Sequence, residues 1–381
     1  MFEALKKAGE HRVTLKETLV TSELQINYNS LAHYAKLNIN SIVVLDALGS
    51  KFMIFRDYGD FFNTSNQLFT GVPTVNAGSI SVIQKNKIEF PSVSSSCSVM
   101  VKDAFLKFYS EYIERTVLAS NYRNEKKIKA FDLINGKITT LERCCLSYGP
   151  NLISGHCDTT GTSSNPFSSI DSVKKAISEL IEKNELILFW YLNLGEKIDA
   201  NDAEVKKLIK DNLLSNFEVC LFKLRFLSSW NTVIGVLFKD GQIVSTGICC
   251  NENYRSALEG AIQEMKILRV LNSYKLNTMF SLTQDEQNRV YKKLYYFKNK
   301  TLPSNQIKVS DDLNLSVNQM ISDLNIAILS KGKFNAVVSA YSSSLIKCIP
   351  TKENLNDCLE IMIVKNIGTK NITSNPDCII L

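Results

Sequence analysis

Two short acidic segments of this chain share a spacing that could bring carboxylates together. They are residues 111–115 (EYIER) and residues 179–183 (ELIEK), and each closes an apolar stretch with helical periodicity. Residues three apart on an α-helix lie on one face, with Cβ atoms about 5–6 Å apart. Each segment therefore predicts a pair of carboxylates followed at once by a cation.

If the two pairs faced each other, they would concentrate four negative charges. Such a cluster is costly in a protein interior unless cations neutralise it. Carboxylates are also the hard oxygen ligands that Mg²⁺ takes beside nucleotide phosphates. The alternative is that each pair belongs to a solvated helix face, and ordinary helix patterning favours that alternative for a single pair. The repetition favours a metal site.

The cation after the first pair allows two interpretations. Arg115 lies four residues after Glu111, so it is placed for an intrahelical ion pair worth about 0.2–0.5 kcal/mol. A guanidinium fork is equally suited to holding a phosphate oxygen. The sequence leaves both roles open.

The elements that must position these residues are three helices that alternate with strands. The apolar spacing predicts helices over about 98–118 and 171–190, the second with Asp171 as its N-cap, and a third that opens at Asn251 or Asn253 and carries Glu264. Strand patterns precede each helix, which indicates an α+β body with internally related units.

Other segments define the rest of the body. Asn135-Gly136 predicts a hairpin over 129–141, and Asp240-Gly241 predicts a turn between strands at 232–238 and 242–249. The serine-rich stretches 92–98 and 154–169 are predicted to be loops that offer N–H groups to an anion. Near the end of the chain we expect a helix at 315–329 and a strand at 359–367.

Several common types of protein are disfavoured. Neither GxxxxGK[ST] nor GxGxxG after a strand occurs, so conventional nucleotide-binding loops are absent from the sequence. The net charge of +6 is spread along 381 residues, which does not indicate nucleic-acid binding. No segment has the composition of a signal peptide or a membrane span, so we expect a cytoplasmic protein that acts away from membranes.

The ten cysteines show no CxxC spacing and no disulfide-rich rhythm. Residues 144–145 (CC) with residues 156–157 (HC) form the only histidine and cysteine cluster, and its spacing matches no standard zinc pattern. We therefore expect free thiols that mostly pack as small hydrophobes.

Three stretches carry a resemblance to a known family. They are residues 101–115 (VKDAFLKFYSEYIER), 161–190 (GTSSNPFSSIDSVKKAISELIEKNELILFW) and 244–268 (VSTGICCNENYRSALEGAIQEMKIL). The chain resembles YcaO-domain proteins, in particular the cyclodehydratase subunits of microcin B17-type azole and azoline peptide synthetases. The resemblance implies a YcaO-like α+β fold of mostly antiparallel sheets covered by helices. It assigns residues 41–381 to that domain, with a diagnostic core at about 95–270, and leaves 1–40 as an N-terminal segment without an assigned role.

The resemblance also implies an ATP and Mg²⁺ site built from carboxylates on helices. The implied metal ligands are Glu111, Glu114, Glu179 and Glu182. The implied nucleotide-binding residues are Lys107, Glu111, Asp171, Glu179 and Glu264. The implied catalytic cations are Arg115 and Lys183.

What the resemblance implies about function is ATP-dependent activation of a backbone amide in a ribosomally made precursor peptide. A Cys, Ser or Thr side chain of the substrate would attack the preceding carbonyl carbon, ATP would phosphorylate the oxyanion, and loss of phosphate would leave a thiazoline or oxazoline. Thioamide or amidine formation is the alternative within the family. A separate subunit that binds the leader peptide, and a homodimer within such a complex, are the expected partners.

The chain departs from the family pattern at several positions. Lys107 stands where serine is frequent, Phe167 where an asparagine would help to bind nucleotide, and Gly260 where a basic residue is common. The proline-rich C-terminus typical of azoline-forming members is absent from residues 375–381. These departures support a further alternative, a non-catalytic scaffold subunit that keeps the fold.

Overall fold

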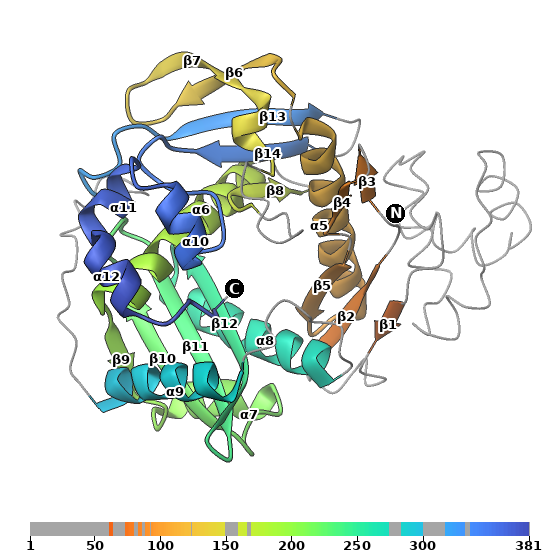
Figure 1. Cartoon of the computed structure of the whole chain (residues 1–381). Coiled ribbons are helices and arrows are strands. Elements are labelled where there is room, and N and C mark those ends of the chain that lie inside the picture. Colours follow the sequence, from red (N-terminus) through yellow and green to blue (C-terminus); the bar gives the residue numbers. More distant parts are fainter. Residues whose placement is uncertain are drawn as a thin grey trace, which may run out of the picture.

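The computed structural model describes residues 61–63, 73–79, 83–85, 88–91, 93–122, 124–148, 159–165, 169–273, 283–299, 317–331 and 336–380. The N-terminal segment 1–40 lies outside these residues. Within them, every pairing between strands is antiparallel. The α+β class predicted from the sequence, antiparallel sheets covered by helices, is confirmed (Figure 1).

Two larger sheets form the body. One has the order β12-β11-β10-β9 and comprises β9 (Glu196–Ile198), β10 (Glu218–Leu224), β11 (Asn231–Lys239) and β12 (Gln242–Asn251). The other has the order β7-β6-β13-β14-β8 and comprises β6 (Lys127–Asp132), β7 (Lys137–Glu142), β8 (Thr162–Ser164), β13 (Asn325–Lys331) and β14 (Ala336–Tyr341).

Two smaller sheets lie near the start of the described chain. One joins β1 (Phe61–Asn63), β2 (Thr74–Ser79) and β5 (Val93–Ser98), and the other pairs β3 (Ile83–Lys85) with β4 (Ile88–Phe90). The first of them is covered by α5 (Val101–Asn121). It therefore supplies one strand, β5, that the first carboxylate pair contacts, through Glu111.

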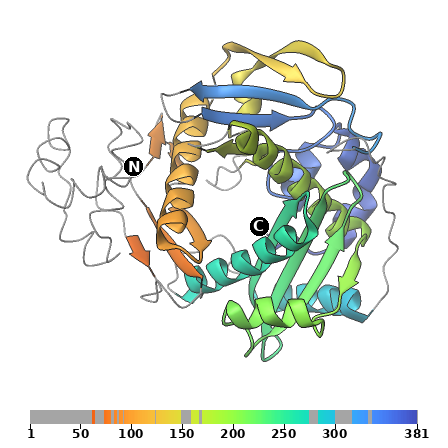
Figure 2. The same ribbon diagram turned by 180° about the vertical axis from the view of Figure 1, so that it is seen from behind.

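The longest helix, α6 (Ser169–Leu192), lies between the two larger sheets in both views (Figures 1 and 2). It packs against β14 and β8 on one side and against β12 and β11 on the other. Side chains along β11 point alternately to the two faces of its sheet. Ile234 and Val236 pack with α6, whereas Val233 and Leu237 pack with α8 (Tyr254–Ser273). A strand buried on both faces reads as a continuous apolar run, as this one does.

Shorter helices complete the body. They are η1 (Arg143–Leu146), α7 (Ala203–Asp211), α9 (Gln284–Asn299), α10 (Lys352–Asp357), α11 (Met362–Ile367) and α12 (Thr369–Ser374). The segment that follows α12 packs back onto α6, where Trp190 Nε1 donates to the carbonyl of Pro376 at 2.8 Å. Within the described part of the chain, no helix has both the length and the apolar character needed to cross a bilayer.

Several local predictions are confirmed. The hairpin around Asn135-Gly136 joins β6 to β7, with Gly136 at φ +61°, and Asp240-Gly241 joins β11 to β12. Asn253 caps α8, because its side chain accepts from the N–H of Ser256 at 3.1 Å. Turn chemistry and capping are local, so the sequence carried enough information for them.

Other local predictions are wrong. Residues 93–98 form strand β5 because they pair with β2, and Thr162–Ser164 within the second expected loop form strand β8 on the edge of β14. Helix α6 begins at Ser169, so Asp171 lies inside the first turn and is not the N-cap. The expected helix at 315–329 contains part of β13, and the expected strand at 359–367 contains α11, whose buried residues Ile363, Val364 and Ile367 have helical spacing.

Candidate functional site

The first carboxylate pair projects from α5 towards two different strands. Glu111 accepts a hydrogen bond from the backbone N–H of Ser95 in β5 at 2.8 Å. Glu114 accepts one from the N–H of Ser164 in β8 at 2.6 Å. The two side chains therefore tie α5 to both a small sheet and the five-stranded sheet.

Arg115 forms the intrahelical contact that its spacing allows. Its Nη2 lies 2.6 Å and its Nε 3.2 Å from Oε1 of Glu111. The pair is half-buried, with about a quarter of each side chain exposed. Glu111 thus neutralises and orients the guanidinium.

The second pair lies on α6, and one of its two residues, Glu182, is deeply buried. Glu182 is 5% exposed and accepts from the N–H of Cys250 in β12 at 2.9 Å. Lys183 Nζ lies 3.8 Å from its Oε1. Glu179 is paired with Lys175, whose Nζ lies 3.4 Å from Oε1.

The third acid, Glu264 on α8, reaches the same strand. Its Oε2 accepts from the N–H of Ile248 in β12 at 2.6 Å. Helix α8 can approach the strand this closely because two contact positions are glycine. A Cβ at Gly260 would lie 2.9 Å from the Cβ of Cys249, and one at Gly247 would lie 2.7 Å from the backbone nitrogen of Met265. A larger side chain at position 260, such as the basic residue that the family resemblance led us to expect, would clash with Cys249 in this packing.

The carboxylates of the three helices act on one another. Burial, then the neighbouring carboxylate of Glu179, raise the pKa of Glu114 well above its usual range. Burial also raises the pKa of Glu179, and Glu182 adds to this effect while Lys175 opposes it. The two pairs are therefore close enough for Glu114 and Glu179 to act on each other electrostatically.

Glu264 extends this group from the other side. Burial, with a contribution from Glu182, raises its pKa to about 7, although Lys183 acts in the opposite direction. The acids that converge from α5, α6 and α8 will be called the carboxylate cluster. Its members are Glu111, Glu114, Glu179, Glu182 and Glu264.

The donor chemistry of the carboxylate cluster fits Mg²⁺. Neighbouring carboxylates disfavour one another's ionisation, and a bound cation would offset that repulsion and stabilise the ionised forms. Within the described ranges, no three of the cluster's carboxylates have ligand atoms within 4.8 Å of one another. Mg²⁺ beside nucleotides is usually bound through one or two carboxylates together with substrate phosphates, and the carboxylate cluster is not a complete set of metal ligands by itself.

Two predicted nucleotide-binding residues, Lys107 and Asp171, have exposed side chains. Lys107 is exposed, and its Nζ donates to the carbonyl of Cys97 at 3.2 Å. Asp171 is exposed on the first turn of α6. Phe167 lies outside the described residues. The roles assigned to Lys107 and Asp171 stay predictions.

Lys347 was not expected at this site. It is 9% exposed, its Nζ donates to Oγ of Ser339 at 2.8 Å, and burial lowers its pKa to about 7 while Cys145 and Glu179 act to raise it. An amine with a pKa close to neutrality and within electrostatic reach of Glu179 can exchange a proton under physiological conditions. Its signal in the sequence was a lysine within the apolar run 345–349 (LIKCI).

Glu185 was also not expected. It is fully buried on α6, where its Oε1 accepts from the N–H groups of Phe226 and Leu227 at 2.8 and 2.6 Å. Burial raises its pKa to about 7. Its position three residues after Glu182 repeats the spacing of the pair, and that repetition was visible in the sequence.

Comparison with solved structures identifies the fold. The chain is similar to the Escherichia coli microcin synthetase McbBCD complex, with a TM-score of 0.52 and 13% identity over 75% of this chain and 88% of that chain. It is also similar to YcaO from Methanopyrus kandleri bound with AMPPCP and Mg²⁺, with a TM-score of 0.55 and 13% identity over 75% and 85% of the two chains. A heterocyclase in complex with substrate and cofactor gives a TM-score of 0.51 and 10% identity over 77% of this chain and 50% of that one.

The sequence comparisons give no further assignment. No family model matches the sequence, and no curated protein matches it. The structural similarity therefore establishes that this chain has the YcaO-type fold predicted from its sequence.

Proposed function

We propose that this chain, which has the YcaO-type fold, uses ATP and Mg²⁺ to activate a backbone amide of a ribosomally made precursor peptide. Ring closure by a Cys, Ser or Thr side chain to an azoline is the reaction that we assign to it. The observation that carries the proposal is the convergence of carboxylates from α5, α6 and α8, with the pKa values of Glu114, Glu179 and Glu264 raised. Similarity to a YcaO structure that holds AMPPCP and Mg²⁺ supports the choice of cofactors.

The metal-binding role belongs to Glu111, Glu114, Glu179 and Glu182, and Glu264 completes the nucleotide site. When bound, Mg²⁺ and ATP supply the phosphoryl group that makes the amide oxygen a good leaving group. The chain's carboxylates would hold the ions, and backbone hydrogen bonds to three strands fix the side chains of Glu111, Glu114 and Glu182 before binding.

Two cations complete the proposed site. Glu111 orients Arg115 so that the guanidinium plane is fixed beside the carboxylate cluster. The side chain of Lys183 is 19% exposed and lies 3.8 Å from Glu182. Its charge also lowers the pKa of Glu264. We assign to both the stabilisation of negative charge on the transferred phosphoryl group.

A precursor peptide and a second subunit are the proposed partners. One similar structure is the E. coli microcin synthetase McbBCD complex with pro-MccB17 bound, with a TM-score of 0.53 and 13% identity over 78% of this chain and 90% of that chain. By analogy, we propose that a separate subunit binds the leader region of the precursor and presents its core to this chain, and that the chain forms a homodimer within that complex.

Calorimetric titration with Mg²⁺ and the non-hydrolysable nucleotide AMPPCP tests the proposal. We expect binding by the unmodified protein and its loss in Glu114→Gln and Glu182→Gln. Glu252→Gln is the matched control, because Glu252 is an exposed glutamate paired with Lys174 on the surface. Absence of binding by the unmodified protein, with and without partner and peptide, would favour the scaffold alternative.

Mass spectrometry of the product tests the reaction type. After incubation with partner, precursor peptide and ATP, azoline formation removes one water per modified residue. Exchange of oxygen for sulfur in the peptide indicates a thioamide instead. That result would keep the proposed ATP site and would show that the nucleophile is a sulfur donor and not a substrate side chain.

A further inference from the structure

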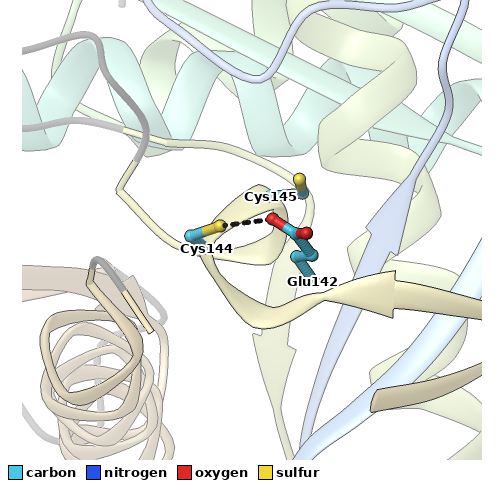
Figure 3. Close-up of side chains that lie close together, drawn as sticks. All are labelled: Glu142, Cys144 and Cys145. Carbon is cyan, nitrogen blue, oxygen red and sulfur yellow. Dashed lines mark hydrogen bonds between the residues drawn. The ribbon is translucent and has the colours of Figure 1, made fainter. Parts of the chain in front are cut away.

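A second group of metal-binding side chains lies where β7 runs into η1. Glu142 is the last residue of the strand, and Cys144 and Cys145 belong to the 3₁₀ turn that follows (Figure 3). Side chains on this turn do not alternate between the two faces of a sheet, as they would in a strand.

The donor atoms are already close together. One carboxylate oxygen of Glu142 and the two Sγ atoms all lie within 4.8 Å of one another. Cys144 Sγ donates to Oε2 of Glu142 at 3.6 Å. Bond lengths of about 2.3 Å to sulfur and about 2.0–2.2 Å to oxygen in a tetrahedral zinc site place the ligand atoms roughly 3.5–3.8 Å apart. Small side-chain rotations are therefore sufficient to bind an ion.

The backbone beneath these donors is held firmly. The N–H groups of Arg143 and Cys144 donate to the carbonyls of Lys126 and Asn124, both at 3.0 Å. Ser147 Oγ donates to the carbonyl of Leu118 on α5 at 2.6 Å. The turn is thus fixed to both the neighbouring strand and a helix, as a preorganised ligand set requires.

Accessibility and charge favour an ion over other uses of these thiols. Glu142 and Cys145 are exposed and Cys144 is half-buried, so an ion can enter from solvent. The thiolate is the form of cysteine that binds a metal ion. A divalent cation would replace the thiol protons.

The other adjacent cysteine pair provides an internal comparison. Cys249 and Cys250 lie in β12, where successive side chains point to opposite faces of the sheet. Cys249 lies against Gly260 on α8, and Cys250 is buried in the core on the α6 side. Adjacency in the sequence alone therefore does not make a site.

We propose that Glu142, Cys144 and Cys145 bind one zinc ion or another thiophilic divalent cation, with a fourth coordination position open to solvent. Two thiolates and one carboxylate suit zinc and disfavour Mg²⁺. The site is independent of the proposed function, because none of its three ligands belongs to the carboxylate cluster. The 3₁₀ turn η1 itself packs against α5, the helix that carries Glu111 and Glu114.

Titration of the fully reduced protein with Co²⁺ in the absence of oxygen tests the proposal. We expect one equivalent to bind with a sulfur-to-cobalt charge-transfer absorption, and Zn²⁺ to displace it. Cys144→Ser and Cys145→Ser should each abolish or strongly reduce the absorption and weaken zinc binding by at least about tenfold, since even changes in outer-shell partners cost about 10–100-fold. Glu142→Gln should weaken affinity while keeping the sulfur absorption.

Two control variants make the result decisive. Cys249→Ser removes a thiol near the carboxylate cluster, and Glu182→Gln removes a member of that cluster, so both should leave the absorption unchanged. Circular dichroism verifies the fold of each variant. The proposal is overturned if the unmodified protein shows no sulfur absorption, if the absorption survives Cys145→Ser, or if Cys249→Ser abolishes it.

Discussion

The two carboxylate pairs have the same spacing but are neutralised in different ways. On α5, a guanidinium four residues later contacts Glu111 at 2.6 Å. On α6, Lys175 Nζ lies 3.4 Å from Glu179 and Lys183 Nζ lies 3.8 Å from Glu182. Glu111 is thus closely compensated within its own helix, whereas the pKa of its partner Glu114 is raised well above its usual range by burial and by Glu179. The comparison indicates that a bound cation would matter most to Glu114 and to the more loosely paired acids of α6.

The pairs also differ one turn further along each helix. The position three residues after Glu182 is Glu185, whereas the position three residues after Glu114 is Val117. Val117 packs beside the core formed by α5, β6 and β13, and Glu185 binds the backbone N–H groups of Phe226 and Leu227. An identical spacing can therefore place one glutamate in a candidate site and the next in a purely structural contact.

The largest expected effect is a loss of ligand affinity when a carboxylate of either pair is removed. Glu182→Gln and Glu114→Gln should each reduce affinity for Mg²⁺ and AMPPCP by about 100-fold, at the upper end of what changes around a metal site cost. Glu114→Gln should at the same time stabilise the protein without ligand at pH 8, because it removes a carboxylate whose ionisation burial and Glu179 disfavour. Calorimetry and urea unfolding of the same samples measure both effects. A variant that loses stability and ligand binding together would indicate a structural role instead.

The sequence predicted the elements that carry the site better than the contacts that complete it. The spacing of the pairs, the Asn135-Gly136 turn and the cap at Asn253 are local signals, and the helices and hairpins that they define are present. The pairing of residues 93–98 with β2 depends on a segment about twenty residues away, so a serine-rich composition wrongly indicated a loop.

The site contacts that the sequence did not predict also depend on segments that are distant in the chain. Lys347 reaches the neighbourhood of Glu179 only because β14 lies beside β8 and α6, and no local pattern encodes that arrangement. Gly260 looked like a departure from the family pattern, yet it follows from the approach of α8 to Cys249. Such contacts between distant segments are fixed by packing, which a single sequence does not display.

A pH experiment distinguishes Glu185 from Glu264, a member of the carboxylate cluster. Folding raises the pKa of Glu185 from 4.5 to about 7, so the folded chain holds a proton that the unfolded chain releases. The free energy of unfolding should therefore fall as pH rises from about 4.5 to about 7, by roughly 3 kcal/mol from this group. Glu185→Gln should remove that part of the slope in urea unfolding between pH 5 and 8.

Glu264→Gln is the matched comparison for that experiment. The pKa of Glu264 is also raised to about 7, so its removal should flatten the slope in the same direction. Saturating Mg²⁺ and AMPPCP should abolish the effect of Glu264→Gln but leave that of Glu185→Gln. Equal sensitivity of both variants to ligand would place Glu185 in the site as well.

A smaller effect is expected where α8 meets β12. Gly260→Ala should destabilise the protein by about 1–3 kcal/mol, because the new Cβ overpacks against Cys249. Alanine is otherwise favoured over glycine in a helix by about 0.8–1.0 kcal/mol, so a net loss would demonstrate the clash. Denaturant unfolding measures it, with Ser256→Ala on the exposed side of the same helix as control. A gain in stability would show that the helix can move away without cost.

Exchanging the two cations gives the smallest effect on stability and the finest comparison of the pairs. Arg115→Lys removes a half-buried intrahelical contact worth about 0.2–0.5 kcal/mol, and Lys183→Arg adds a fork to the second pair. If Arg115 only neutralises Glu111, the free energy of unfolding of Arg115→Lys should fall by that small amount and its affinity for AMPPCP should be unchanged. We expect instead a loss of affinity well beyond that range in Arg115→Lys, partly restored in the double variant, because the fork is then supplied from α6. Unchanged affinity in both variants would assign Arg115 to the helix alone and leave the phosphate to other groups.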